Sequence, residues 1–189
     1  MRSNILKPLS FLPARHHLNR WAYGYYLVKK GFSTCIVMEE TSFTYKQIRK
    51  IREDLAINKE HRRASYGQDI LSREGWIKYS AAINVYVELS EKMHHIEAVV
   101  KAFEWLKSEK NFNISGFYKA CKEIKSGEAF FVECVHCRNE VFSGPGLRDK
   151  VVSCRCPACG KTNWERPQTD HRLGHIATCT KPGDQQPLF

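Results

Sequence analysis

The chain has 189 residues and a formal net charge of +10, with 30 Lys and Arg against 20 Asp and Glu. This length allows one hydrophobic core and one further small module. No run approaches the roughly eighteen apolar residues of a membrane-spanning helix, and Lys7, Pro8 and Pro13 interrupt the stretch where a signal peptide would be apolar. We therefore expect a cytoplasmic protein without membrane association.

The positive charge is concentrated in the first third of the chain. Residues 1–63 contain 13 Lys and Arg against 5 Asp and Glu, residues 64–133 contain 9 against 10, and residues 134–189 contain 8 against 5. A basic end beside a neutral middle favours a surface that binds a polyanion, joined to a segment that packs. A basic surface that only keeps the protein soluble would give the same counts.

The first helix is predicted from near Ala14 to Gly31, after an N-terminal arm formed by residues 1–14. Apolar side chains recur on one stripe of this helix at Leu18, Trp21, Tyr25 and Val28. We interpret the stripe as core or interface.

Two further helices follow, separated by a tight turn. Ser33 is positioned to cap a short helix over residues 34–40, residues 41–43 form the turn, and Thr44 caps a second helix that runs to about Leu55. Ile48, Ile51 and Leu55 share one face of the second helix. A short helix, a turn and a helix with an apolar inner face are typical of a helix-turn-helix.

The rest of the second helix is basic or carries an amide. Gln47 and Arg49 are chemically able to read base edges, whereas Lys46, Lys50 and Arg52 suit phosphates. The basic loop that follows offers further phosphate contacts at Lys59, Arg62 and Arg63. An ordinary solvated amphipathic helix would show the same pattern.

The remaining body is predicted to be helical. Residues 68–107 contain two longer helical patterns that meet at His94 and His95, which we interpret as a polar corner. A last helix covers residues 117–124 and stops at Gly127, and residues 130–132 form a strand.

Four cysteines then form two Cys-x-x-Cys pairs separated by eighteen residues. These are Cys134, Cys137, Cys156 and Cys159. This spacing is typical of a zinc ribbon, in which four thiolates hold one structural Zn²⁺ and leave no position open for catalysis. Gly160 supplies a residue with positive φ after the second pair, and Asn139, which tolerates that conformation, lies just after the first.

Other features support or compete with the zinc interpretation. Short β-prone runs at residues 141–142 and 151–152 flank a turn at 143–146, and Arg138, Arg155 and Lys161 offset the −2 charge of the site. A redox pair, two disulfides or an iron–sulfur cluster remain alternatives, although a redox pair is expected in a βαβ setting and disulfides in a secreted chain. Cys154 could replace Cys156 as a ligand.

The other cysteines and the end of the chain carry weaker signals. Cys35, Cys121 and Cys179 are expected to be buried or free thiols. Trp164 is placed to close the small core of the ribbon, and a second metal site at His171, His175 and Cys179 is disfavoured because Gly174 interrupts the segment. Residues 167–189 are predicted to be a flexible tail.

The order of these parts resembles the FlhC family of bacterial transcriptional activators, which includes the flagellar master regulator subunit and relatives on conjugative elements. The likeness covers roughly residues 22–160 and runs through the helix end at Gly31, the basic helix 45–55, the helix containing Trp76, the segment 96–103 and the cysteine pairs. The charged stretch 58–65 stands where flagellar members have a proline-rich loop. Cys154 is an added thiol.

The resemblance implies a transcription activator subunit that works in a hetero-oligomer with an FlhD-like partner, with zinc ligands at Cys134, Cys137, Cys156 and Cys159. We therefore expect a mainly α protein with an N-terminal arm (1–14), a helical DNA- and partner-binding domain (15–128), a four-cysteine zinc ribbon (129–166) and a tail (167–189). The expected function is non-enzymatic binding of double-stranded DNA at the nucleoid, with recruitment of RNA polymerase. The ribbon would add a second basic surface through Arg138, Arg148, Lys150 and Arg155.

Three alternatives belong to other classes. A zinc ribbon can also bind RNA, and it can serve as a staple in a protein–protein adaptor. A nuclease would need clustered carboxylates to hold a hydrolytic metal, and Asp149 and Asp170 form no evident cluster.

Overall fold

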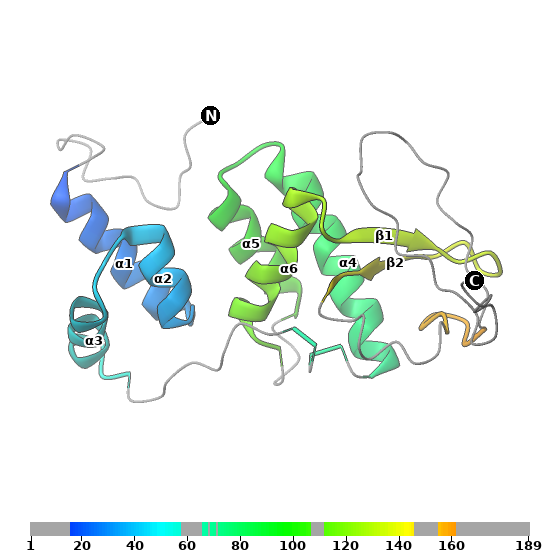
Figure 1. Cartoon of the computed structure of the whole chain (residues 1–189), viewed down its shortest axis with the longest axis horizontal. Coiled ribbons are helices and arrows are strands. Elements are labelled where there is room, and N and C mark those ends of the chain that lie inside the picture. The colour runs from blue at the N-terminus through cyan, green and yellow to red at the C-terminus, as the bar shows by residue number, and fades with distance from the viewer. Residues whose placement is uncertain are drawn as a thin grey trace, which may run out of the picture.

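The computed structural model describes residues 16–57, 66–67, 69–70, 72–106, 112–145 and 155–161. Within them the chain is mainly helical, as predicted, with one two-stranded sheet (Figure 1). The elements are α1 (His17–Lys30), α2 (Thr34–Thr41), α3 (Tyr45–Asp54), α4 (Arg73–Ser90), α5 (His95–Phe103), the 3₁₀ helix η1 (Glu104–Leu106), α6 (Ile114–Ser126), β1 (Phe130–Glu133) and β2 (Glu140–Ser143).

Several predicted regions lie outside the described residues. They are the arm 1–14, residues 58–65 of the predicted basic loop 58–67, the β-prone run 151–152, Trp164 and the tail 167–189. Among the described residues, no helix is long and apolar enough to cross a membrane.

The first three helices pack against one another, and local signals set their ends. Gly31 ends α1 with φ of 92°, and its N–H donates to backbone carbonyls of the last turn. The predicted stripe of α1 is buried only in part: Val28 is fully buried, Trp21 and Tyr25 are half-buried, and Leu18 in the first turn is 45% exposed. Burial therefore begins after the first turn.

The turn between α2 and α3 is short and well capped. Ser42 adopts a left-handed conformation at the end of α2. Thr44 caps α3, as predicted: its hydroxyl accepts from the backbone N–H of Gln47, while the Gln47 side chain accepts from the backbone N–H of Thr44. Ser33 precedes α2, but its side chain makes no capping bond.

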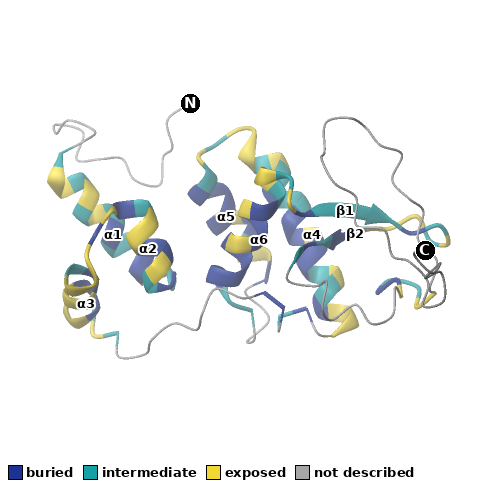
Figure 2. Cartoon of the chain, viewed as in Figure 1, coloured by how far each residue is buried: buried dark blue, intermediate teal, exposed yellow. Residues whose placement is uncertain are grey.

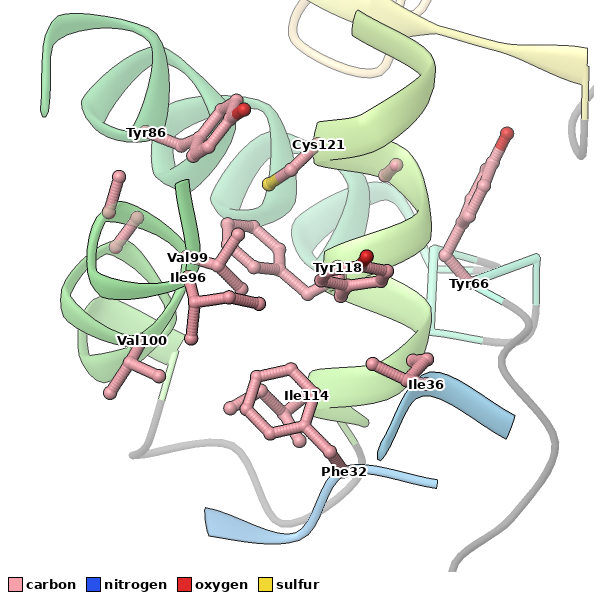
Figure 3. Close-up of a cluster of buried hydrophobic side chains, with 14 of the residues drawn as sticks. Phe32, Ile36, Tyr66, Tyr86, Ile96, Val99, Val100, Ile114, Tyr118 and Cys121 are labelled. Atoms are coloured by element: carbon pink, nitrogen blue, oxygen red, sulfur yellow. The ribbon is translucent and has the colours of Figure 1, made fainter. Parts of the chain in front are cut away.

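One continuous core joins this first group of helices to α4, α5 and α6. Figure 3 shows Phe32 and Ile36, which flank the start of α2, beside Ile114 and Tyr118 of α6. Each of the four is at most 6% exposed, and the Phe32 and Tyr118 rings meet edge to face. In Figure 2 the dark blue of buried residues covers most of α5 and also appears on α2 and α6.

Polar contacts tie the same two groups together. The Glu40 carboxylate of α2 accepts from the Tyr118 hydroxyl at 2.6 Å and from the Tyr23 hydroxyl at 3.3 Å. Glu39 pairs with Lys122 of α6. The orientation of α2 against α6 is therefore fixed by hydrogen bonds as well as by apolar packing.

Tyr66 belongs to the core, although the sequence suggested a basic loop at this point. It is 1% exposed, its ring contacts those of Tyr79 and Phe142, and its hydroxyl donates to the buried carboxylate of Glu123. Burial raises the pKa of Glu123, and the Tyr66 bond opposes that rise. Tyr66 thus gives a buried acid a donor and links α6 to the sheet.

A substitution at Gly24 tests how closely α1 packs on the turn before α3. A Cβ at this position would lie 2.6 Å from Cε2 of Phe43 and 3.2 Å from Cδ1 of Ile51, both buried side chains. Gly24→Ala gains roughly 1 kcal/mol of helix propensity, but overpacking a core opposes it by roughly 1–3 kcal/mol. We expect a net loss of stability in urea denaturation. A gain would show that the crossing is loose.

Candidate metal centre

The first cysteine pair lies in the loop of a β-hairpin. β1 and β2 are antiparallel, with Glu133 opposite Glu140, so that residues 134–139 form the connection. The backbone N–H of Cys134 donates to the carbonyl of Asn139 at 3.1 Å, and the N–H of Arg138 donates to the carbonyl of Cys134 at 2.8 Å. The loop therefore folds back on its first cysteine.

The second pair repeats this backbone pattern. The N–H of Cys156 donates to the carbonyl of Lys161 at 2.7 Å, and the N–H of Gly160 donates to the carbonyl of Cys156 at 2.8 Å. Gly160 has φ of 77°, as predicted. The equivalent residue of the first pair is Arg138, with φ of 59°, so the expectation for Asn139 is wrong.

The two pairs place their four sulfur atoms close together. The Sγ atoms of Cys134 and Cys159 lie 3.7 Å apart, and those of Cys137 and Cys156 lie 3.6 Å apart. All four sulfurs fall within 4.8 Å of one another. Figure 1 shows residues 155–161 beside the far end of the hairpin.

These distances fit a single metal ion. A tetrahedral site with metal–sulfur bonds of about 2.3 Å places its sulfurs about 3.8 Å apart. A disulfide would require about 2.05 Å, so both short pairs are free thiols. The predicted ligand set is thereby brought together, with Cys156 in it.

The surroundings of the sulfurs differ between the two pairs. At Cys134, burial raises the pKa, but backbone N–H groups of Cys137 and His136 and the nearby thiols outweigh it and lower the pKa to about 7. At Cys156, burial dominates and raises the pKa to about 12, against the N–H groups of Ala158 and Cys159. A cation at the centre is the agent that would stabilise all four thiolates together.

Charged residues around the site are exposed. Arg138 donates to the Glu133 carboxylate at 3.3 Å, and Arg155 and Lys161 face solvent. Arg148, Lys150 and Cys154 lie outside the described residues, as do His171, His175 and Cys179. Of the remaining thiols, Cys121 is buried and Cys35 is exposed.

One helix holds the hairpin against the body. The indole N–H of Trp76 in α4 donates to the carbonyl of Phe142 at 2.8 Å, and the N–H of Phe142 donates to the Ser80 hydroxyl at 2.9 Å. Arg73, one turn before Trp76, donates to the backbone carbonyls of Pro157 and Ala158. Sequence reasoning did not identify Arg73, Trp76 and Ser80 as a site, although their spacing of three and four residues places them on one helix face.

The residues predicted to contact DNA on α3 divide into two groups. Lys46, Arg49 and Lys50 are exposed, and Arg49 pairs with Glu53 at 2.9 Å on the same face. Gln47 is half-buried and its carbonyl is engaged in the cap. Arg52 is only 9% exposed, against the expectation of a surface residue. Lys59, Arg62 and Arg63 lie outside the described residues.

The burial of Arg52 has a simple cause. Arg52 lies four residues after Ile48 and one after Ile51, so it shares the helix face that packs on α1 and α2. Its Nε and one terminal nitrogen are buried without a hydrogen-bond partner. Lys46 and Lys50 lie on the other side of the helix.

Comparison with known proteins assigns no family. No protein-family model matches the chain, and no curated protein matches it either.

Metal content tests the cluster directly. We expect the purified chain to hold one metal ion, and Cys156→Ser to reduce the content to well below one per chain, because a serine hydroxyl is a poor replacement for a thiolate ligand. Cys35→Ser, at an exposed thiol away from the cluster, serves as the matched control and should keep one ion. Equal metal content in both variants would exclude the cluster as the site. Elemental analysis makes the measurement.

Proposed function

We propose that the chain is a sequence-specific DNA-binding subunit of a transcriptional activator, with no enzymatic activity. The observation that carries the proposal is the two-sided α3. Ile48 and Ile51 are fully buried on one side, while Lys46, Arg49 and Lys50 are exposed on the other. A helix anchored in this way can present its basic side to a DNA groove without losing its packing.

The elements around α3 suit a helix-turn-helix. α2 packs on α3 across a three-residue turn, and α1 contacts both helices. In that motif the first turns of the second helix approach base edges in the major groove. Tyr45, 52% exposed, and Arg49 lie one turn apart at this end of α3.

Residues of α3 take different roles in the proposed complex. Arg49 can read a guanine edge with two parallel hydrogen bonds once it leaves Glu53, and Lys46 and Lys50 neutralise phosphates. Arg52 is omitted from this contact set because of its burial.

The metal of the four-cysteine site is proposed to be a structural Zn²⁺. Four thiolates match the preference of zinc for sulfur ligands and fill its tetrahedral shell. Zinc would then stabilise the hairpin and the second cysteine pair against α4. Arg138 and Arg155, both exposed, would add basic surface there.

The partners are proposed from the resemblance to the FlhC family. They are an FlhD-like subunit that forms the hetero-oligomer and RNA polymerase at the target promoters, in the bacterial nucleoid. The order of parts supports this proposal: a helical body that contains the α2–α3 pair precedes the four-cysteine site.

Base reading and phosphate binding are separable by substitution on α3. We expect Arg49→Ala to weaken discrimination at particular base pairs by about 1–3 kcal/mol, whereas Lys50→Ala weakens binding to all duplexes alike. Lys92→Ala, an exposed lysine in the turn after α4, should leave binding unchanged. Site selection from fragmented genomic DNA, followed by titration of matched and mutated sites, gives these numbers.

The full chain captured from its host with crosslinked nucleic acid distinguishes the classes. Discrete promoter-upstream sites together with a small FlhD-like protein would support the activator. Recovery of structured RNA would instead favour the ribbon as an RNA reader, and recovery of protein alone would favour an adaptor. Uniform losses for Arg49→Ala across all sequences would remove the base-reading assignment.

A further inference from the structure

Arg73 of α4 contacts the backbone of the second cysteine pair. It occupies the first position of α4, and its guanidinium donates to the carbonyls of Pro157 and Ala158, 84 and 85 residues further along the chain. Those two carbonyls lie between Cys156 and Cys159. The contact therefore reaches the centre of the second pair.

The two peptide groups that Arg73 binds also face the metal centre. The N–H groups of Ala158 and Cys159 donate to the sulfur of Cys156. In a trans peptide the carbonyl points opposite to the N–H of the next residue, so these same two planes present carbonyls on their other side. Arg73 holds both carbonyls, and each plane is thereby fixed between a guanidinium and a cysteine sulfur.

We propose that Arg73 is a positioning residue of the metal centre, which orients the two peptide groups that solvate the Cys156 thiolate. Donation to a carbonyl polarises the peptide group and strengthens donation from its N–H. A planar guanidinium suits this task because it offers several donors in fixed directions.

The two cysteine pairs are supported differently. The first lies between β1 and β2, whose pairing fixes both ends of its loop. In the second pair, the described residues 155–161 are held to the body by the Arg73 guanidinium, which donates to two of their backbone carbonyls. The backbone at Arg73 is fixed by the helix cap, because the Ser72 hydroxyl accepts from the N–H of Gly75 at 2.9 Å.

The inference rests on the metal-binding role of the four cysteines and is independent of DNA binding. It predicts that Arg73→Gln speeds transfer of Zn²⁺ from the loaded full chain to a chromophoric chelator by about 10-fold or more. Mutation of groups that support metal ligands typically lowers metal affinity by about 10–100-fold. Lys78→Gln removes the same charge from the same helix, where Lys78 pairs with Glu74 at 2.7 Å. We expect that control to release zinc at the wild-type rate.

A second measurement separates positioning from general stability. Thermal unfolding of each protein is compared with and without metal, and the metal-dependent rise in Tm should shrink in Arg73→Gln but not in Lys78→Gln. Release at the control rate, or equal loss of Tm with and without metal, would overturn the role of Arg73. A wild-type chain that binds no metal would overturn it together with the metal site, whereas normal wild-type binding confines a failure to Arg73.

Discussion

The N–H and the carbonyl of Phe142 point away from β1, and side chains of α4 supply their hydrogen bonds. A two-stranded sheet leaves each strand with one unpaired edge, and a buried edge is costly without partners. The Trp76 indole and the Ser80 hydroxyl satisfy the carbonyl and the N–H of this one residue. Ser80 also donates to the carbonyl of Trp76, so its hydroxyl both accepts and donates. Side chains of α4 thus satisfy the outward-facing backbone groups of Phe142, as a neighbouring strand would do in a larger sheet.

This attachment makes the metal site part of the body rather than a separate appendage. Phe142 is fully buried and packs against the rings of Tyr66 and Tyr79, which belong to the same core as α5 and α6. The strand that leads away from the first cysteine pair is therefore part of the main core. A disturbed α4 would also move the supports of both cysteine pairs.

The features that sequence predicted correctly depend on short stretches of chain. Gly31 and Gly127 end helices because a left-handed residue closes a helix locally, and Thr44 caps α3 with a partner three residues away. The two cysteine pairs are equally local, and the fold places their four sulfur atoms within 4.8 Å of one another. Such signals are contained in a few consecutive residues.

The features that sequence missed depend on the fold as a whole. Arg73 meets the second cysteine pair across more than eighty residues, and Tyr66 meets Glu123 and Phe142 in the core although both lie far along the chain. Arg52 is different, because its place beside Ile48 and Ile51 was available from helical spacing. The prediction of a surface role for Arg52 relied on its charge and not on this position.

The separation along the chain between α4 and its partners sets an order of events during synthesis. Trp76 leaves the ribosome 66 residues before Phe142, and Arg73 leaves it 84 residues before Pro157. At about 5–20 residues per second, α4 waits several seconds or more before its outer face is covered. During that interval the Trp76 side chain is open to other proteins, chaperones among them. The four-cysteine cluster can only assemble last, once residues near 160 have emerged, so a nascent chain can meet other proteins before its cysteines come together.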